Sequence, residues 1–222
     1  MKHPAPAVID RVLAALASRP PATMLGSFAG RRSAFQILIG TILSARSRDE
    51  MTERVCEVLF HRFPTAKRLA QARPRDIVPI LRLIGFYRQK AKFIIATARI
   101  IVAKHAGRVP ATIDELLELP GVGRKVANCV LVYAFGKPAI AVDTHVHRIA
   151  NRLGWVRTKT PEDTERALAR LLPRRHWLTI NEILVAHGKT ICRPIGPKCD
   201  VCPAARWCRK RGVGDRVRGL DH

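Results

Sequence analysis

The sequence of 222 residues lacks any apolar run of about 18 residues, the length that a membrane-spanning helix needs. No segment is therefore predicted to cross a bilayer. Its first residues follow a short amphipathic helical pattern and lack the long apolar block of a signal peptide. We therefore expect an intracellular protein whose cysteines are reduced or bound to metal.

Aromatic residues are also scarce, at 5% of the chain, although hydrophobic residues make up 47%. The core must therefore be packed by Leu, Ile, Val and Ala, which suits helices. No segment shows the sustained alternation of apolar and polar residues that marks a β-strand. These observations predict an all-α fold of about ten helices.

Three helices of this fold can be predicted individually. Apolar residues from Ala91 to Val102 recur at spacings of three and four, which indicates a long helix over 87–105 with a stripe facing the core. The strongly apolar segment 33–44 fits a buried helix or a buried strand, and its length and helical flanks favour the helix. The last long helix is expected over 177–187, closed by Gly188.

Acidic residues are few, since 17 Asp and Glu stand against 40 Lys and Arg, and the formal net charge is +23. So many positive charges repel one another and destabilise the folded protein unless it binds a polyanion. Nucleic acid is the leading candidate for this partner, and an anionic membrane surface is the second.

The middle of the chain, residues 112–155, has the clearest local pattern. Thr112 and Glu115 have the spacing of a capping box, so a short helix is expected to begin there. The glycine-rich segment 120–123 ends this helix, and a second helix is expected over 124–135. In such a helix–hairpin–helix, the backbone N–H groups of the hairpin and of the second helix point outward together. This arrangement suits an anion such as a phosphate group.

A lysine and an aspartate accompany this hairpin. Lys125 lies in the first turn of the second helix, and Asp143 precedes a further helix that is expected to end at Gly154. Taken singly, such a lysine is usually a phosphate contact, and such an aspartate is usually a helix cap. Their joint presence next to a phosphate-binding turn favours a catalytic pair.

Two segments resemble a known superfamily. LPGVGRK at 119–125 is similar to the hairpin of the helix-hairpin-helix DNA glycosylases, and AVDTHVHRIANRLG at 141–154 to their aspartate-bearing segment. The resemblance is strongest to the endonuclease III branch and runs over about residues 28–208. It implies a monomeric, two-lobed, all-α protein with a DNA-binding cleft between the lobes.

The resemblance also implies the division of the chain. A six-helix barrel domain with the helix-hairpin-helix would cover residues 27–137. An iron–sulfur cluster domain would combine residues 1–26 with 138–222. A protein of this kind is expected in the cytoplasm, associated with the nucleoid through its DNA binding.

Roles for single residues follow from the resemblance. Lys125 would attack C1′ of a nucleotide flipped out of the duplex, and Asp143 would stabilise the positive charge that develops on the sugar. Arg46, where the family has a glutamine, and Phe86, where it has an aliphatic wedge, would fill the gap in the base stack. The other implied DNA contacts are Gly121, Val122, Gly123, Arg124 and His145. Phe86 fits equally well as a loop aromatic that covers the core, and His145 as a helix-surface histidine.

A lysine at position 125 implies a base-excision-repair DNA glycosylase with associated AP lyase activity. The implied substrates are oxidised or ring-saturated pyrimidines, such as thymine glycol, and abasic sites in double-stranded DNA, cut on the 3′ side by β-elimination. Two alternatives are a mismatch-specific uracil or thymine glycosylase and a non-catalytic DNA-binding protein. The second is disfavoured, because phosphate binding needs neither Lys125 nor Asp143.

The six cysteines fall into two groups. Cys56 and Cys129 occur singly in helical patterns and are interpreted as small buried residues. The other four follow the pattern C-x6-C-x2-C-x5-C and can surround one metal centre, for which zinc and a cubane cluster are the candidates. The spacing matches the [4Fe–4S] loop of the endonuclease III family, so the resemblance implies this cluster as the cofactor. Its ligands would be Cys192, Cys199, Cys202 and Cys208.

Overall fold

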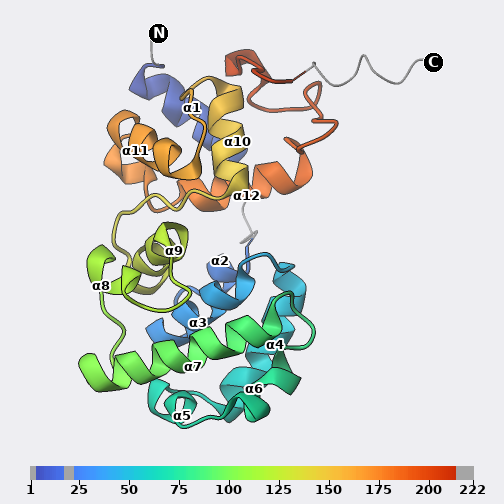
Figure 1. Ribbon diagram of the computed structural model, residues 1–222. Coiled ribbons are helices and arrows are strands. Elements are labelled where there is room, and N and C mark those ends of the chain that lie inside the picture. The colour runs from blue at the N-terminus through green and yellow to red at the C-terminus, as the bar shows by residue number, and fades with distance from the viewer. Residues whose placement is uncertain (1–3, 18–22, 214–222) are drawn as a thin grey trace, which may run out of the picture. The chain divides into compact units, whose positions relative to one another are not determined.

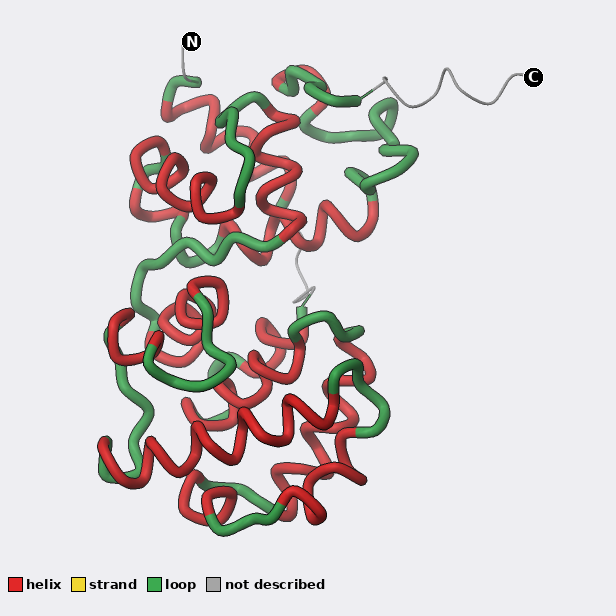
Figure 2. The backbone as a smooth tube through the Cα atoms, viewed as in Figure 1, coloured by secondary structure: helices red, strands yellow, loops and turns green. Residues whose placement is uncertain are grey.

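The computed structural model describes residues 4–17 and 23–213 (Figure 1). Over these ranges every regular element is helical and no strand occurs, so the predicted all-α fold is confirmed (Figure 2). None of the helices in these ranges combines the length and apolar character needed to cross a membrane. The chain divides into two compact units, a continuous unit of residues 23–141 and a split unit that combines residues 4–17 with 142–213.

The continuous unit contains eight helices. Three of the eight, α2, α5 and α8, have only five residues each. Each begins at a threonine whose hydroxyl accepts a backbone N–H of the first turn, which stabilises a helix of little more than one turn. The eight helices are α2 (Met24–Phe28), α3 (Ala34–Ser44), α4 (Asp49–Arg62), α5 (Ala66–Ala70), α6 (Pro74–Leu81), α7 (Tyr87–Lys104), α8 (Ile113–Leu117) and α9 (Arg124–Phe135).

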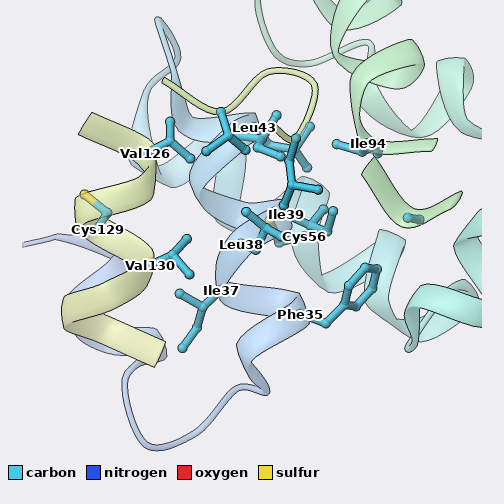
Figure 3. Packing of buried hydrophobic residues seen from close by; sticks show 14 of the residues in the cluster. Phe35, Ile37, Leu38, Ile39, Leu43, Cys56, Ile94, Val126, Cys129 and Val130 are labelled. Atoms are coloured by element: carbon cyan, nitrogen blue, oxygen red, sulfur yellow. The ribbon is translucent and has the colours of Figure 1, made fainter. Parts of the chain in front are cut away.

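The core of the continuous unit is built around α3. Ser33 begins this helix with a reciprocal capping box, in which Ser33 Oγ accepts from Gln36 N and Gln36 Oε1 accepts from Ser33 N. All residues from Ile37 to Leu43 are buried, so the apolar segment is a buried helix, as predicted. Val126 and Val130 of α9 point toward α3 in the core (Figure 3). The helix that follows the hairpin is thus mounted on the most buried helix of the unit.

The long helix α7 and its core-facing stripe were predicted correctly except at Val102. Val102 was expected to face the core and is 37% exposed, whereas Lys90 is only 5% exposed. The Lys90 ammonium donates to Leu43 O and to Ser47 Oγ, both at 2.8 Å. Burial lowers the pKa of Lys90 to about 8. The core-facing stripe of α7 therefore begins with a charged residue that reaches back to the end of α3.

The split unit joins the two ends of the described chain. Four residues of α1, Ile9, Val12, Leu13 and Leu16, are buried, and α1 packs against α12. Helix α10 packs against both α11 and α12. The elements are α1 (Pro6–Leu16), α10 (Thr144–Leu153), α11 (Pro161–Leu171), the 3-10 helix η1 (Arg174–His176), α12 (Ile180–Thr190) and the 3-10 helix η2 (Ala205–Trp207).

The expectation that Gly188 closes the last long helix is wrong. α12 begins at Ile180, and it continues through Gly188 to Thr190. A Cβ atom on Gly188 would lie 2.4 Å from His145 Nδ1 and 2.9 Å from Arg148 Nη2, both on α10. This glycine is therefore required by the close approach of two helices and not by the end of one.

Candidate functional site

The hairpin between α8 and α9 rests on α7. Gly121 has a φ of +80°, and a Cβ atom there would lie 2.9 Å from the Phe93 ring of α7. On the same side, Thr97 Oγ1 donates to Pro120 O at 2.9 Å. Both the backbone conformation and the contact with the ring require glycine at position 121. The inner side of the hairpin is thus fixed by packing.

The outer side of the hairpin is backbone, followed by two basic residues. The Val122 side chain is buried, whereas a Cβ atom on Gly123 would meet nothing within 4 Å. No side chain caps α9, which begins directly after Gly123. Arg124 is exposed and Lys125 is half-buried in the first turn. The partial positive charge of the helix N-terminus therefore coincides with two cationic side chains, a combination that attracts a phosphate group.

Arg46 and Phe86 lie together although they are far apart in the sequence. Both are non-glycine residues in the left-handed region, with φ of 54° and 58°. The Arg46 guanidinium carbon lies 5.6 Å from the centroid of the Phe86 ring, which is a cation–π distance. The ring is 62% exposed, so Phe86 does not cover the core, which was the alternative interpretation. Such backbone conformations cost roughly 1–3 kcal/mol each and persist where neighbouring contacts enforce them.

Asp143 caps α10 in the split unit. Its Oδ1 accepts from both His145 N and Val146 N at 2.9 Å, and α10 ends at Gly154 with a φ of 78°. The expected capping role is therefore present. Because both capping bonds are made to Oδ1, they fix the orientation of the carboxylate without using Oδ2. A fixed carboxylate with a second oxygen outside the cap can still take part in chemistry.

His145 is half-buried and packs against Gly188 of α12. Arg148 Nη2 lies 3.2 Å from its Nδ1, and the Gly188 backbone is a second hydrogen-bond partner of the ring. Burial lowers the pKa of His145 below its ordinary value, although the nearby Asp143 charge opposes this. The lowered pKa favours the neutral form of the ring near pH 7.

The four cysteines of the C-terminal pattern line one pocket of the split unit. One tetrahedral zinc ion would bring their sulfur atoms to within about 3.8 Å of one another. In the described ranges, no three His, Cys, Asp or Glu side chains are grouped closely enough for a single metal ion. Four cysteines around one pocket are also the ligand set of a cubane cluster. The four residues are Cys192, Cys199, Cys202 and Cys208.

Several N–H groups approach these sulfur atoms. Arg152 Nη1 donates to Cys192 Sγ at 3.4 Å, and the backbone N–H of Lys210 donates to Cys208 Sγ at 3.4 Å. Donors of this kind stabilise thiolates, which is the form in which cysteine binds metal. The pocket therefore has the ligand type of a thiolate-bound cluster and N–H donors beside it, while burial raises the pKa of Cys202 and of Cys208 above the ordinary value of a thiol.

Helix α10 also supports the cysteine loop through two arginines on one of its faces. Arg152 is only 8% exposed, and it donates to Arg193 O at 2.6 Å and to Pro194 O at 2.9 Å. Arg148, one turn earlier, donates to Cys192 O at 2.9 Å. The helix that orients Asp143 at its start is thus the helix that holds the first part of the cysteine loop.

Sequence reasoning missed three residues that shape these sites: Lys90, Arg152 and Gly188. A signal was present for Lys90, which lies four positions before Ile94 on the apolar face of α7. No local pattern distinguishes Arg152 or Gly188. Of the predicted catalytic pair, Lys125 belongs to the continuous unit and Asp143 to the split unit.

Comparisons with known proteins agree with one another. The family model described as "HhH-GPD superfamily base excision DNA repair protein" matches residues 39–174. Endonuclease III of Thermotoga maritima is 52% identical over 184 residues, which cover 82% of this chain and 86% of that protein. Two solved structures, a non-covalent endonuclease III–DNA complex and a trapped endonuclease III–DNA covalent intermediate, match with TM-scores of 0.84 and 0.81. Each of the two is 33% identical to this chain, and each alignment covers 93% of this chain and 96% of the matched chain. The chain therefore belongs to the HhH-GPD superfamily of base excision DNA repair proteins and, within it, to the endonuclease III family of bifunctional DNA glycosylases and AP lyases.

Proposed function

We propose that this base-excision glycosylase and lyase removes oxidised or ring-saturated pyrimidines, such as thymine glycol, from double-stranded DNA, with Lys125 as its nucleophile. The observation that carries the proposal is the position of Lys125, half-buried in the first turn of α9 directly after the hairpin. If the N–H groups of the hairpin bind a DNA phosphate, the Lys125 amine next to them lies beside the sugar of the same nucleotide. The trapped covalent intermediate of the related endonuclease III supports the same chemistry.

The proposed reaction has two steps. The neutral Lys125 amine attacks C1′, and the bond from C1′ to the base breaks, so the base leaves with the bonding electrons and gains a proton. The sugar ring opens to give a Schiff base between Lys125 and C1′. Loss of a proton from C2′ then expels the 3′ phosphate, which cuts the strand on the 3′ side. Hydrolysis of the Schiff base regenerates the amine.

Asp143 is assigned to the first step. As the base leaves, positive charge develops on the sugar, and an oriented carboxylate stabilises this charge. Oδ1 is held by the two capping bonds, so Oδ2 is the oxygen available for this role. A carboxylate that has to cap a helix cannot turn away from its target, which is an advantage in a catalytic group.

Replacement of Asp143 by asparagine should separate capping from catalysis. Asparagine caps a helix as well as aspartate does, whereas alanine costs about 0.5–2 kcal/mol. We expect Asp143→Asn to keep its melting temperature but to excise thymine glycol roughly 10²–10³-fold more slowly. Borohydride trapping on a preformed abasic site, which has no base to expel, should fall much less. Equal losses on both substrates would contradict the assigned step, and Thr160→Ala, which removes the cap of α11, controls for helix capping.

The remaining site residues are assigned to DNA binding. The outer side of the hairpin, from Gly121 to Arg124, would bind the backbone next to the lesion, and the His145 ring would contact a phosphate group. Arg46 and Phe86 would enter the base stack in place of the extruded nucleotide. These assignments follow the donor chemistry and exposure of each group.

Arg46 should set the preference for the opposite base. A guanidinium donates two hydrogen bonds to O6 and N7 of guanine, but it has no acceptor for the amino group of adenine. We expect excision opposite guanine to exceed excision opposite adenine by about tenfold, within the 1–3 kcal/mol of one bidentate contact. Arg46→Gln should remove or reverse this ratio, while Arg48→Gln, an exposed arginine two residues away, should leave it unchanged. An unchanged ratio in Arg46→Gln would remove Arg46 from base recognition.

The four cysteines of the split unit are proposed to hold one [4Fe–4S] cluster, with one thiolate from each. Such a cluster supplies a structural cross-link here, since protein ligands would occupy every outer iron position. We accordingly assign the split unit as the cluster domain and the continuous unit as the helix-hairpin-helix barrel domain. The DNA-repair role would place the protein in the cytoplasm at the nucleoid.

Borohydride trapping tests the proposed function directly. The protein is mixed with duplexes that carry thymine glycol, an abasic site, or a uracil or thymine mismatch, and covalent protein–DNA bands are counted after reduction. We expect bands from the thymine glycol and abasic duplexes. A band from the abasic duplex alone would refute the lesion class, and excision of only the mismatched base would select the mismatch-specific alternative. DNA binding without any band or excision would refute the enzymatic proposal.

A further inference from the structure

Lys90 is a buried cation that none of the proposed steps uses. It lies on α7, is 5% exposed, and donates to the neutral oxygens Leu43 O and Ser47 Oγ. Lysines are rarely buried to this degree unless they are paired. Although burial lowers the pKa of Lys90 to about 8, the ammonium remains the main form at pH 7. Burying a charged ammonium is energetically unfavourable, so we expect Lys90 to have a specific role.

The side chain of Lys90 bridges the turn that carries Arg46. Leu43 is the penultimate residue of α3, where carbonyl groups lack partners within the helix and favour a cation. Ser47 lies on the other side of the turn, and its N–H donates to Ser44 O at 3.1 Å. The ammonium therefore closes the turn from Leu43 to Ser47, and Arg46 with its φ of 54° lies inside it.

The backbone of the same residue belongs to the turn that carries Phe86. Phe86, with a φ of 58°, is the N-cap of α7, and Lys90 N donates to Phe86 O at 3.0 Å in the first turn of the helix. Between the two turns, a Cβ atom on Gly85 would lie 3.3 Å from Arg46 O. Lys90 is thus bonded to one turn through its side chain and to the other through its backbone.

We infer that Lys90 is a positioning residue that joins Arg46 and Phe86 into a preassembled wedge for the base stack of the damaged duplex. The inference rests on the proposed function of the two residues. Their left-handed conformations require surrounding contacts to hold them, and Lys90 provides contacts to both turns. The two side chains are already ordered before the protein binds DNA. They therefore lose less conformational entropy on entering the base stack, which favours binding.

This role makes a prediction that separates two substrates. A duplex must be opened and its stack filled, whereas a single-stranded abasic oligonucleotide needs no wedge. Lys90→Met keeps the length of the side chain and removes the ammonium. We expect it to lower trapping and excision on duplex substrates by about tenfold and to leave trapping on single-stranded abasic DNA within about twofold. Lys92→Met, at an exposed lysine of the same helix, should match the wild type on both.

Three further measurements make the result decisive. A 2-aminopurine placed opposite the lesion reports stack filling by its fluorescence, and its change should be smaller with Lys90→Met than with the wild type. In an Arg46→Ala/Phe86→Ala background, Lys90→Met should have no additional effect, because the wedge is already absent. Ser47→Ala removes one partner and keeps the ammonium, and it should reproduce the duplex defect more weakly. It also serves as the second variant if Lys90→Met does not fold.

The outcomes distinguish the inference from the function on which it rests. Equal losses of Lys90→Met on single-stranded and duplex DNA, or additive losses in the double-alanine background, would reduce Lys90 to a general stability role and overturn the inference. Wild-type activity of Lys90→Met and Ser47→Ala on the duplex would also overturn it. If the wild type itself fails to trap abasic DNA, the proposed function fails instead.

Discussion

Lys125→Ala should eliminate borohydride trapping and lower both base excision and strand cleavage by at least about 10³-fold. In the proposed mechanism the amine attacks C1′, and the Schiff base that it forms undergoes the β-elimination, so neither step proceeds without it. Alanine has the highest helix propensity, so α9 should still begin at Arg124. DNA binding should weaken only modestly, because the hairpin and the start of α9 remain in place.

The control for this prediction is Lys67→Ala, which removes an exposed lysine from α5 of the same unit. This variant lowers the net charge equally and should trap DNA as the wild type does. Trapping and thermal unfolding should be measured on the same preparations. A covalent band of normal intensity from folded Lys125→Ala would show that another amine is the nucleophile.

Replacement of one cysteine of the pocket should strongly lower the stability of the protein. After α12, the only buried hydrophobic residue among those described is Ala204, and the only regular element is η2. Little apolar burial therefore holds residues 192–208, so the proposed cluster would supply much of their stability, beside the hydrogen bonds from Arg148 and Arg152. We expect Cys202→Ala to lose bound iron and visible absorbance, and its melting temperature to fall by roughly 10 °C or more, as a loss of several kcal/mol implies.

The control is Cys129→Ala, which replaces a buried cysteine on α9 in the continuous unit, whereas Cys202 is only partly buried. It should keep its full iron content and lose at most the small free energy of a core cavity. Iron content, zinc content and absorbance are measured together on both variants. Wild-type protein that contains one zinc and no iron would refute the cluster.

The sequence was most informative where one residue decides a local structure. Gly136 and Gly154 end α9 and α10 with positive φ, and Asp143 begins α10, so both helices were predicted with their boundaries. A helix cap and a glycine with positive φ both depend on residues that are close in the sequence. Sequence patterns therefore reveal these helix boundaries.

Other features depend on segments that meet only in the folded chain. Gly188 was misread as a helix end, because its requirement comes from His145 and Arg148 on another helix. Lys90 lies in an apolar stripe, but its partners belong to the turn after α3. The sequence does not distinguish a wedge from a core cover at Phe86, and its exposure of 62% argues against the core cover only. Such contacts are tertiary, and no periodicity in the sequence encodes them.

The division of the split unit has a consequence for the order of synthesis. On the ribosome, α1 emerges before the continuous unit, but its helical partner α12 is made only after it. The nascent chain must therefore shield Ile9, Val12, Leu13 and Leu16 during translation of more than half of the protein. Because domains fold as units when their residues become available, the continuous unit is expected to fold first. Helix α1 would then pack against α12 only late in folding.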